Sequence, residues 1–246
     1  MAQHFPSPAL SIAAPCFNEE ENIEAVVRDW ADMFQRQNLT GQIVVCNDGS
    51  LDGTTGILNR LTGEFPFLVH VHNPVNGGYG HALGCAIRAT TGQWVMTMDS
   101  DGQFDPDEYA KLKAVQESTG ADCVTGCRMG KKDTFLRVIA DRIMNLMVRV
   151  MFGLRLKDTN CAQKLVRGEV LRSLHLEAMG YPTPTEICVK VKEGGYSLAE
   201  VGVIHLDRTA GASKLKLFKT GWNALQFFMY LACKVRLYRK RVLNKL

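Results

Sequence analysis

Five short apolar runs alternate with four segments of helical pattern in the first half of the chain. The apolar runs, which we expect to be strands, span residues 9–14, 43–46, 67–72, 94–98 and 121–125. The helical segments span residues 18–36, 52–61, 80–90 and 106–118. Because strands that alternate with helices at this spacing pair in parallel, the pattern predicts an α/β fold, a mostly parallel sheet with helices on both faces. Ligands of such sheets bind at the carboxyl ends of the strands.

A glycine-rich turn follows the third apolar run. Gly78, Gly80 and Gly84 precede Asp99 by about 20 residues, a spacing similar to the fingerprint of dinucleotide-binding enzymes. In that fold, however, the fingerprint follows the first strand. Here the first run leads into PCFNEE at residues 15–20, whose glutamates would repel a bound pyrophosphate unless a metal intervened. The sequence therefore disfavours an NAD enzyme and leaves another role for the acid at position 99.

Acidic side chains directly follow the fourth run, as DSDGQ at residues 99–103. Two carboxylates two positions apart, with an amide two positions further on, suit a divalent cation. Mg²⁺ takes few protein oxygens and completes its shell with water and substrate phosphates. Polar loops also follow the first and second runs, at residues 15–20 and 47–54. The sequence therefore predicts a metal-dependent site at the carboxyl ends of these strands.

The second half of the chain differs in charge and hydropathy, although one more strand is expected at residues 196–206. Residues 208–246 carry a net charge of +10, and the rest of the chain carries −6. Residues 137–154 have a helical pattern with an unusually wide apolar face, but three arginines and an aspartate within it exclude a membrane span. Burial in the core and docking at a membrane interface both remain open for this helix. The positive charge of the tail favours contact with an anionic partner. The alternative is a solvated helix end, which the aromatic residues of the tail disfavour.

Seven motifs, taken in order, resemble those of family 2 glycosyltransferases. The similarity is greatest to the polyprenyl-phosphate glycosyltransferases, the branch of dolichyl-phosphate mannose synthase, and it covers about residues 9–217. It implies a glycosyltransferase A fold, a GDP- or UDP-linked sugar donor, Mg²⁺ or Mn²⁺, and inversion at the anomeric carbon. The motifs are PCFNEEENI, CNDGSLDGT, NGGYGHALGCAI, MDSDGQFDPDE, VTGCR, DTNCAQKL and HLDRTAGASK.

Carried over position by position, the resemblance implies a donor site and a metal site. The residues implied in donor binding are Pro15, Phe17, Glu19, Asp48, Asp99, Ser100 and Asp101. Asp48 would hydrogen-bond the nucleobase. Asp99, Asp101 and Gln103 would hold the metal against the donor diphosphate, where a metal stabilises the departing nucleoside diphosphate as a Lewis acid. Phe17 stands where the family usually has tyrosine, which removes one hydroxyl from the pocket.

The resemblance also implies a set of cations for an acceptor phosphate: Arg128, Arg137, Arg208 and Lys214. A hydroxyl acceptor needs a general base, whereas a lipid monophosphate is largely dianionic at neutral pH and needs cations instead. We therefore expect a polyprenyl (dolichyl or undecaprenyl) phosphate acceptor. The expected catalytic residues are Asp101, Asp158, Arg128 and Arg208. Ala162 and Gln163 replace the Gly-Phe of many relatives, which leaves the shape around Asp158 open.

Two other functions remain open. The first is a family 2 enzyme with a sugar or other hydroxyl acceptor, in which Asp158 or another carboxylate is the base. The second is a nucleotidyltransferase or an inactive nucleotide-binding subunit, although the intact D-x-D-x-Q argues against inactivity. Nucleic acid is not expected as a partner, because no nucleic-acid-binding motif accompanies the basic tail.

We expect two parts in the chain. Residues 1–213 would form the catalytic domain, including the interfacial helix 137–154, and residues 214–246 a basic amphipathic segment for a membrane surface. Many relatives carry transmembrane helices after this point, so this chain would reach its lipid through these helices or through a separate membrane subunit. No signal-peptide pattern opens the sequence, and the eight cysteines are scattered mostly within apolar segments, as in proteins of a reducing compartment. We therefore expect a cytoplasmic protein, peripheral on the cytoplasmic face of a membrane.

Overall fold

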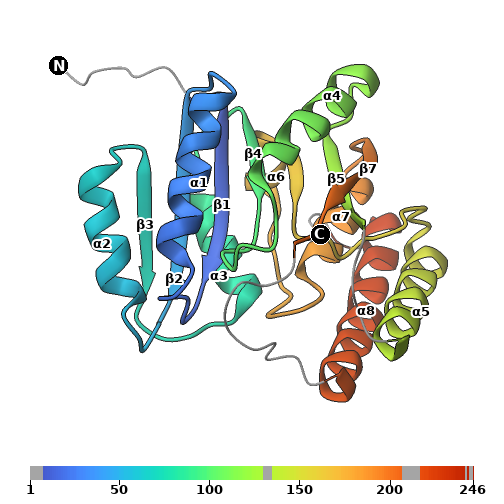
Figure 1. The fold of residues 1–246 in the computed structure, drawn as a ribbon. Helices are drawn as coiled ribbons and strands as arrows, with labels where there is room; N and C mark the ends of the chain where they lie inside the picture. The colour runs from blue at the N-terminus through green and yellow to red at the C-terminus, as the bar shows by residue number, and fades with distance from the viewer. Residues whose placement is uncertain (1–7, 130–134, 207–216, 242, 244–245) are drawn as a thin grey trace.

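A seven-stranded sheet forms the centre of the molecule (Figure 1). The computed structural model describes residues 8–129, 135–206, 217–241, 243 and 246, with the side chains of 135–140 and 217–219 outside this description. The strands are β1 (Leu10–Cys16), β2 (Gly41–Asp48), β3 (Leu68–Asn73), β4 (Trp94–Thr97), β5 (Cys123–Met129), β6 (Lys164–Arg167) and β7 (Leu198–Ile204). They lie in the order β3-β2-β1-β4-β6-β5-β7, and β6 alone among them runs antiparallel to its neighbours. The predicted α/β fold is confirmed.

Helices cover both faces of the sheet, because successive side chains of a strand point to opposite faces. In β1, Leu10 and Ile12 belong to one core and Ala13 to the other. The first core is closed by α1 (Ile23–Arg36), α2 (Thr54–Glu64) and α4 (Tyr109–Thr119), which follows the 3₁₀ helix η1 (Pro106–Glu108). The second core is closed by α3 (Tyr79–Arg88), α6 (Gly168–Ser173) and α7 (Thr183–Glu193).

The elements predicted in the first half are all present, with shifts at their ends. The largest shift is in the first helix, which begins at Ile23 instead of residue 18 because the preceding residues form a loop. Three elements of the second half were not predicted: β6, α6 and α7. β6 is only four residues long. α7 is buried at nearly every position, including Glu186 and Lys190, so its polar residues do not mark an exposed face as they do in an amphipathic surface helix.

A third core lies between α5 (Phe135–Phe152), α7 and α8 (Leu217–Arg239), and Figure 1 shows α5 and α8 side by side. Phe152 of α5 and Phe228 of α8 are buried there, with ring centroids 6.3 Å apart. The helix predicted at 137–154 is therefore packed in a core along one face. Apolar packing also ties the C-terminal helix to the rest of the fold.

The outer faces of α5 and α8 keep large apolar side chains exposed. These side chains are Ile143, Leu146 and Val150 on α5, and Trp222, Met229, Tyr230 and Leu237 on α8. In the part of the chain that the structure describes, no helix is both long and apolar enough to span a bilayer. All eight cysteines are free thiols, and Cys233 on α8 is exposed.

Candidate active site

Hydrogen bonds join the loops that follow β1 and β2 into one rim. Asn18 has a φ of 53°, a left-handed conformation that asparagine tolerates better than most residues. Its N–H donates to Ser50 Oγ (2.9 Å), and its Oδ1 accepts from the N–H of Leu51 (2.8 Å). The N–H of Glu19 donates to Thr54 Oγ1 (2.9 Å). Of the predicted donor residues, this β1–β2 rim (residues 15–20 and 47–54) contains Pro15, Phe17, Glu19 and Asp48.

The acidic loop 99–103 is fixed against the same rim. Ser100 Oγ donates to the carbonyl of Pro15 at the end of β1 (2.8 Å). Asp101 Oδ1 accepts from the backbone N–H of Gln103 (3.2 Å). Ser100 and Asp101 are buried, and Asp99 is half-buried. The structure therefore brings the predicted metal ligands to the edge of the sheet where the first two loops lie.

Asp48, the last residue of β2, holds the glycine-rich turn. Its buried carboxylate accepts from Asn73 Nδ2 (2.8 Å) and from the N–H groups of Gly77 (3.0 Å) and Gly78 (2.7 Å). Gly78 has a φ of 89°, a region that favours glycine. These bonds engage both oxygens of Asp48, so the side chain fixes the shape of the turn. Its contact with a nucleobase stays a prediction.

The turn brings Tyr79 to the acidic loop. Tyr79 begins α3, and its hydroxyl donates to Asp99 Oδ1 at 2.8 Å. Burial, and then the charge of Asp99, raise the pKa of the Tyr79 hydroxyl, so it remains a protonated donor. The loop 178–180 lies against the other side of this turn, since a Cβ on Gly80 would lie 1.6 Å from the carbonyl oxygen of Ala178.

Arg128 and Asp158 form a bidentate ion pair at the end of β5. Arg128 Nε lies 2.6 Å from Asp158 Oδ2, and Nη2 lies 2.9 Å from Oδ1. The two side chains are only 12% and 13% exposed. Burial alone would raise the pKa of Asp158, but the hydrogen bonds and charge of Arg128 outweigh it and hold this pKa below its usual range. Asp158 is therefore an anion held by a cation, and its basicity near neutral pH is low.

Cys161 packs against β5, where a Cβ on Gly126 would lie 2.9 Å from its Sγ. The buried thiol is close enough to interact electrostatically with both Tyr79 and Arg128. The Tyr181 hydroxyl donates to Asp141 of α5 (3.0 Å).

Three of the predicted phosphate-binding residues lie outside the described part of the structure. Arg208 and Lys214 fall within 207–216, and Arg137 belongs to α5 with its side chain outside the description. The residues just before 207 are described. The N–H of Leu206 donates to the carbonyl of Gln103 (2.9 Å), and Gln103 Nε2 donates to the carbonyl of Leu206 (3.4 Å). Leu206, the last described residue before position 207, therefore lies beside the acidic loop.

The oxygen atoms of the acidic loop fit a hard divalent cation. Asp99 and Asp101 supply carboxylates, and Gln103 supplies an amide oxygen that takes no part in the bond from its Nε2. Within residues 8–129, 135–206 and 217–241, no group of three or more His, Cys, Asp or Glu side chains could hold a metal by itself. This donor set fits Mg²⁺ or Mn²⁺, which would take further ligands from water and substrate phosphates.

Tyr79 and the buried charges that shape the loop above the glycine turn were not predicted from the sequence. Glu186 of α7 is fully buried, accepts from the N–H of Ala178 (2.9 Å) and pairs with Lys190 Nζ (2.9 Å). A glutamate four residues before a lysine is visible in the sequence. That spacing usually indicates an exposed ion pair on a helix, which is why it did not stand out.

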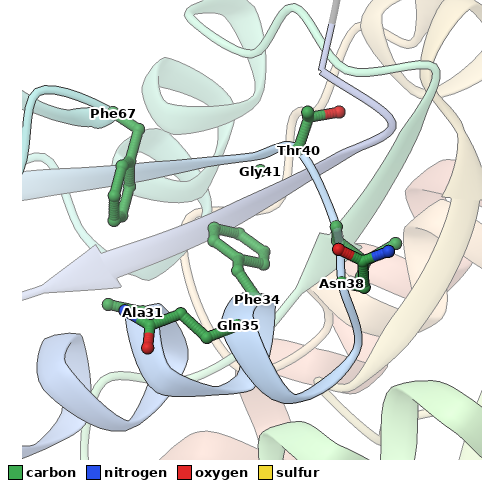
Figure 2. A pocket seen from close by; sticks show the side chains of 8 residues that line it. Ala31, Phe34, Gln35, Asn38, Thr40, Gly41 and Phe67 are labelled. Carbon is green, nitrogen blue, oxygen red and sulfur yellow. The ribbon is translucent and has the colours of Figure 1, made fainter.

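A separate pocket lies at the opposite edge of the sheet, near the start of β2 (Figure 2). Phe34 of α1 and Phe67 face it, with ring centroids 6.0 Å apart. A Cβ on Gly41 would lie 2.2 Å from the ring of Phe34, so glycine is needed there for the ring to pack on the strand. The residues of this pocket pack the end of the sheet away from the polar site.

Comparison with curated proteins identifies relatives over most of the chain. Undecaprenyl-phosphate 4-deoxy-4-formamido-L-arabinose transferase from Serratia proteamaculans (strain 568) is 26% identical over 221 residues, which cover 89% of this chain and 66% of the relative. The protein of the same name from Yersinia pestis (strain Pestoides F) is 26% identical over 222 residues with the same coverage. The chain thus spans 66% of the length of these relatives.

Solved structures share the fold. Glucosyl-3-phosphoglycerate synthase from Mycobacterium tuberculosis in complex with UDP superposes with a TM-score of 0.71 at 20% identity, covering 92% of this chain and 80% of that chain. The same enzyme with Mn²⁺, UDP-glucose and phosphoglyceric acid gives 0.66 at 21% identity, over 94% and 79%. This likeness agrees with the predicted glycosyltransferase A architecture.

The family model described as Glycosyl transferase family 2 matches residues 11–171, from β1 through β6. The chain therefore belongs to glycosyltransferase family 2.

Proposed function

We propose that this chain transfers a sugar, with inversion, from a nucleotide-diphosphate-sugar to a polyprenyl phosphate at the cytoplasmic face of a membrane. Membership of family 2 supports sugar transfer. The curated relatives are named for undecaprenyl phosphate, which supports the acceptor class. Solved structures with this fold hold Mn²⁺ and UDP-glucose, which supports a divalent metal and a UDP-linked donor, with a GDP-linked donor as the alternative.

In the proposed donor complex, the β1–β2 rim would bind the nucleotide, and Asp99, Asp101 and Gln103 would hold Mg²⁺ or Mn²⁺. When bound, such a cation would supply Lewis-acid stabilisation for the charge on the departing nucleoside diphosphate. The protein's contribution is to fix the ligands in advance. The hydrogen bond from Ser100 to the end of β1 holds the acidic loop in place before the donor arrives.

The observation that carries the choice of acceptor is the ion pair of Arg128 and Asp158. A hydroxyl acceptor needs a base whose pKa lies near the working pH, and the pKa of Asp158 is held below its usual range. A lipid phosphate brings its own anionic nucleophile. Arg128 has five N–H donors, of which the pair with Asp158 uses two, so others remain for a phosphate oxygen. The proposed acceptor cations are Arg128, Arg137, Arg208 and Lys214.

A hydroxyl acceptor is the second candidate. The observation that favours it is the fold likeness to glucosyl-3-phosphoglycerate synthase, which was solved with phosphoglyceric acid bound. In that case Asp158 would have to leave Arg128 to act as base. The two candidates therefore differ in what they require of Asp158.

The test is transfer by the purified chain with Mn²⁺, UDP- and GDP-linked sugars, and either a short polyprenyl phosphate or phosphoglyceric acid. Mass spectrometry should detect a glycosylated lipid phosphate and free nucleoside diphosphate. Asp101→Ala should abolish transfer. Arg128→Ala should lower turnover at least about tenfold while Mn²⁺-dependent nucleotide binding persists, because a charge-assisted contact to phosphate is lost. Arg60→Ala, which removes an exposed ion pair between α2 and Glu24 of α1, is the matched control and should keep the wild-type rate.

Asp158→Asn separates the two acceptors. With a phosphate acceptor, the variant should retain more turnover than Arg128→Ala, because Asp158 only orients the guanidinium. If Asp158→Asn were inactive while Arg128→Ala and Arg137→Ala kept normal rates, the hydroxyl acceptor would replace the lipid phosphate. Transfer to phosphoglyceric acid alone would lead to the same conclusion.

We further propose that residues 214–246 and the outer face of α5 hold the catalytic domain, residues 1–213, at an anionic membrane surface. On α8 the exposed Trp222 and Met229 lie on the same helix as the exposed Arg236, and the exposed Lys240 follows the last residue of this helix. Each cation near an anionic leaflet contributes about 1 kcal/mol, and this attraction weakens with salt. The protein should float with anionic liposomes at low salt and less at high salt, and Trp222→Ala should weaken flotation. A protein that stays in the soluble fraction throughout would point to a separate membrane subunit.

A further inference from the structure

We propose that Tyr79 is a positioning residue for Asp99 and thereby sets how tightly the acidic loop binds metal and donor diphosphate. This role rests on the proposed function, in which Asp99 is a metal ligand. The contact itself is short and specific. The Tyr79 hydroxyl, on the first residue of α3, donates at 2.8 Å to Oδ1 of Asp99, which lies two residues after the end of β4.

The hydroxyl of Tyr79 gives the Asp99 carboxylate a fixed hydrogen-bond donor. Asp101, two residues away, carries a second carboxylate, and a divalent cation would take oxygens from both. A hydrogen bond from a neutral hydroxyl holds one carboxylate in place without competing with the metal for charge. Tyr79 therefore reduces the reorganisation that Asp99 must undergo when the metal and diphosphate arrive.

The backbone around Tyr79 is held from one side by Asp48. The carboxylate of Asp48 accepts from the N–H groups of Gly77 and Gly78, the two residues that precede Tyr79. Asn73 Nδ2 donates to the same carboxylate (2.8 Å) and ties it to the end of β3. The entry of the chain into α3 is therefore fixed by a buried anion.

The loop 178–180 holds the same turn from the other side. A Cβ on Gly78 would lie 2.5 Å from the carbonyl oxygen of Met179, and one on Gly80 would lie 1.6 Å from that of Ala178. These glycines flank Tyr79, so the turn is in close contact with the loop on both sides of the tyrosine. A phenol attached to a backbone held in this way can act as a fixed donor.

The experiment measures the binding of Mn²⁺ with UDP, and separately with GDP, by calorimetry on the full chain. Tyr79→Phe removes only the hydroxyl, and Tyr109→Phe removes a hydroxyl from α4 as the matched control. We expect Tyr79→Phe to raise the dissociation constant for the metal–nucleotide pair about tenfold, the effect of losing one hydrogen bond to a charged group. Tyr109→Phe should leave it unchanged. Thermal unfolding of both variants reports whether the fold is kept.

A double-mutant cycle with Asp99→Asn distinguishes positioning from a general structural role. If Tyr79 acts through Asp99, Tyr79→Phe should change metal–nucleotide affinity much less in the Asp99→Asn background than in the wild type. Equal effects in both backgrounds, or wild-type affinity in Tyr79→Phe, would overturn the positioning role and leave the proposed function intact. A wild-type chain that binds neither Mn²⁺ with UDP nor Mn²⁺ with GDP would overturn both.

Discussion

Glu177 connects the C-terminal helix to the loop above the glycine turn, and we predict that Glu177→Gln weakens this connection. Its carboxylate accepts from Lys190 Nζ (2.7 Å) of α7 and from Lys234 Nζ (2.7 Å) and the Tyr230 hydroxyl (2.8 Å) of α8. Glutamine keeps the size of the side chain and removes its charge. The substitution therefore tests the electrostatic part of the contact between α7, α8 and this loop.

The size of the effect follows from the pKa of Glu177. Burial opposes ionisation, but hydrogen bonds from Lys190, Lys234 and Tyr230 outweigh it and lower the pKa from 4.5 to about 2. One pKa unit corresponds to about 1.4 kcal/mol, so the folded state stabilises the anion by at most about 3.5 kcal/mol. The side chain is 18% exposed, and glutamine keeps some hydrogen bonds. We therefore expect a loss of roughly 1–2 kcal/mol in the free energy of unfolding at pH 7.

The pH dependence gives a second measure of the same contact. Because the folded state lowers the pKa of Glu177, its stabilisation is fully present above the unfolded value of 4.5 and is lost as the pH falls toward about 2. Glu177→Gln has no titrating group at this position. The difference in stability between wild type and variant should therefore shrink as the pH is lowered from neutrality to about 3.

Urea unfolding followed by circular dichroism, at pH 7 and at about pH 3.5, measures both quantities. Glu169→Gln is the matched control, because that side chain is 73% exposed and meets Arg167 only at 3.5 Å. We expect it to change the free energy of unfolding by less than about 0.5 kcal/mol. An electrostatic role for Glu177 is contradicted if Glu177→Gln lowers the free energy of unfolding at pH 7 no more than Glu169→Gln does. It is also contradicted if the loss caused by Glu177→Gln does not shrink at low pH.

Gly80→Ala should destabilise the fold by roughly 1–3 kcal/mol and weaken binding of Mn²⁺ with UDP, because the new Cβ would lie 1.6 Å from the carbonyl oxygen of Ala178. Gly56→Ala, whose Cβ meets nothing within 4 Å, is its control, and equal stability of the two variants in urea would contradict the close packing of the turn. Cys233 should react first with a maleimide because it is exposed, whereas burial raises the pKa of Cys16 to about 12 and keeps it unreactive near neutral pH. Cys233→Ser should remove the fast phase of the maleimide reaction. Anionic vesicles should slow this phase in the wild type if α8 docks on them.

The sequence by itself determined the class of fold, and it placed the candidate site at one edge of the sheet. Strands and helices alternate with different hydrophobic periods, and this local pattern is sufficient to predict a parallel sheet with its polar loops at one edge. The acids at Asp99 and Asp101 could be assigned to that edge because they directly follow a strand. β6 and α7 escaped prediction for the opposite reason. One is too short to show a period, and the other is buried on nearly all sides.

Only the tertiary structure decided which side chains meet within the site. Asp48 is tied to a turn about 30 residues away, Tyr79 reaches Asp99, and Arg128 is paired with Asp158 across 30 residues of chain. No local spacing encodes these contacts, because each one depends on how separate strands and helices are ordered in the sheet. The same holds for the low basicity of Asp158, since a pKa is set by burial and by neighbours in space.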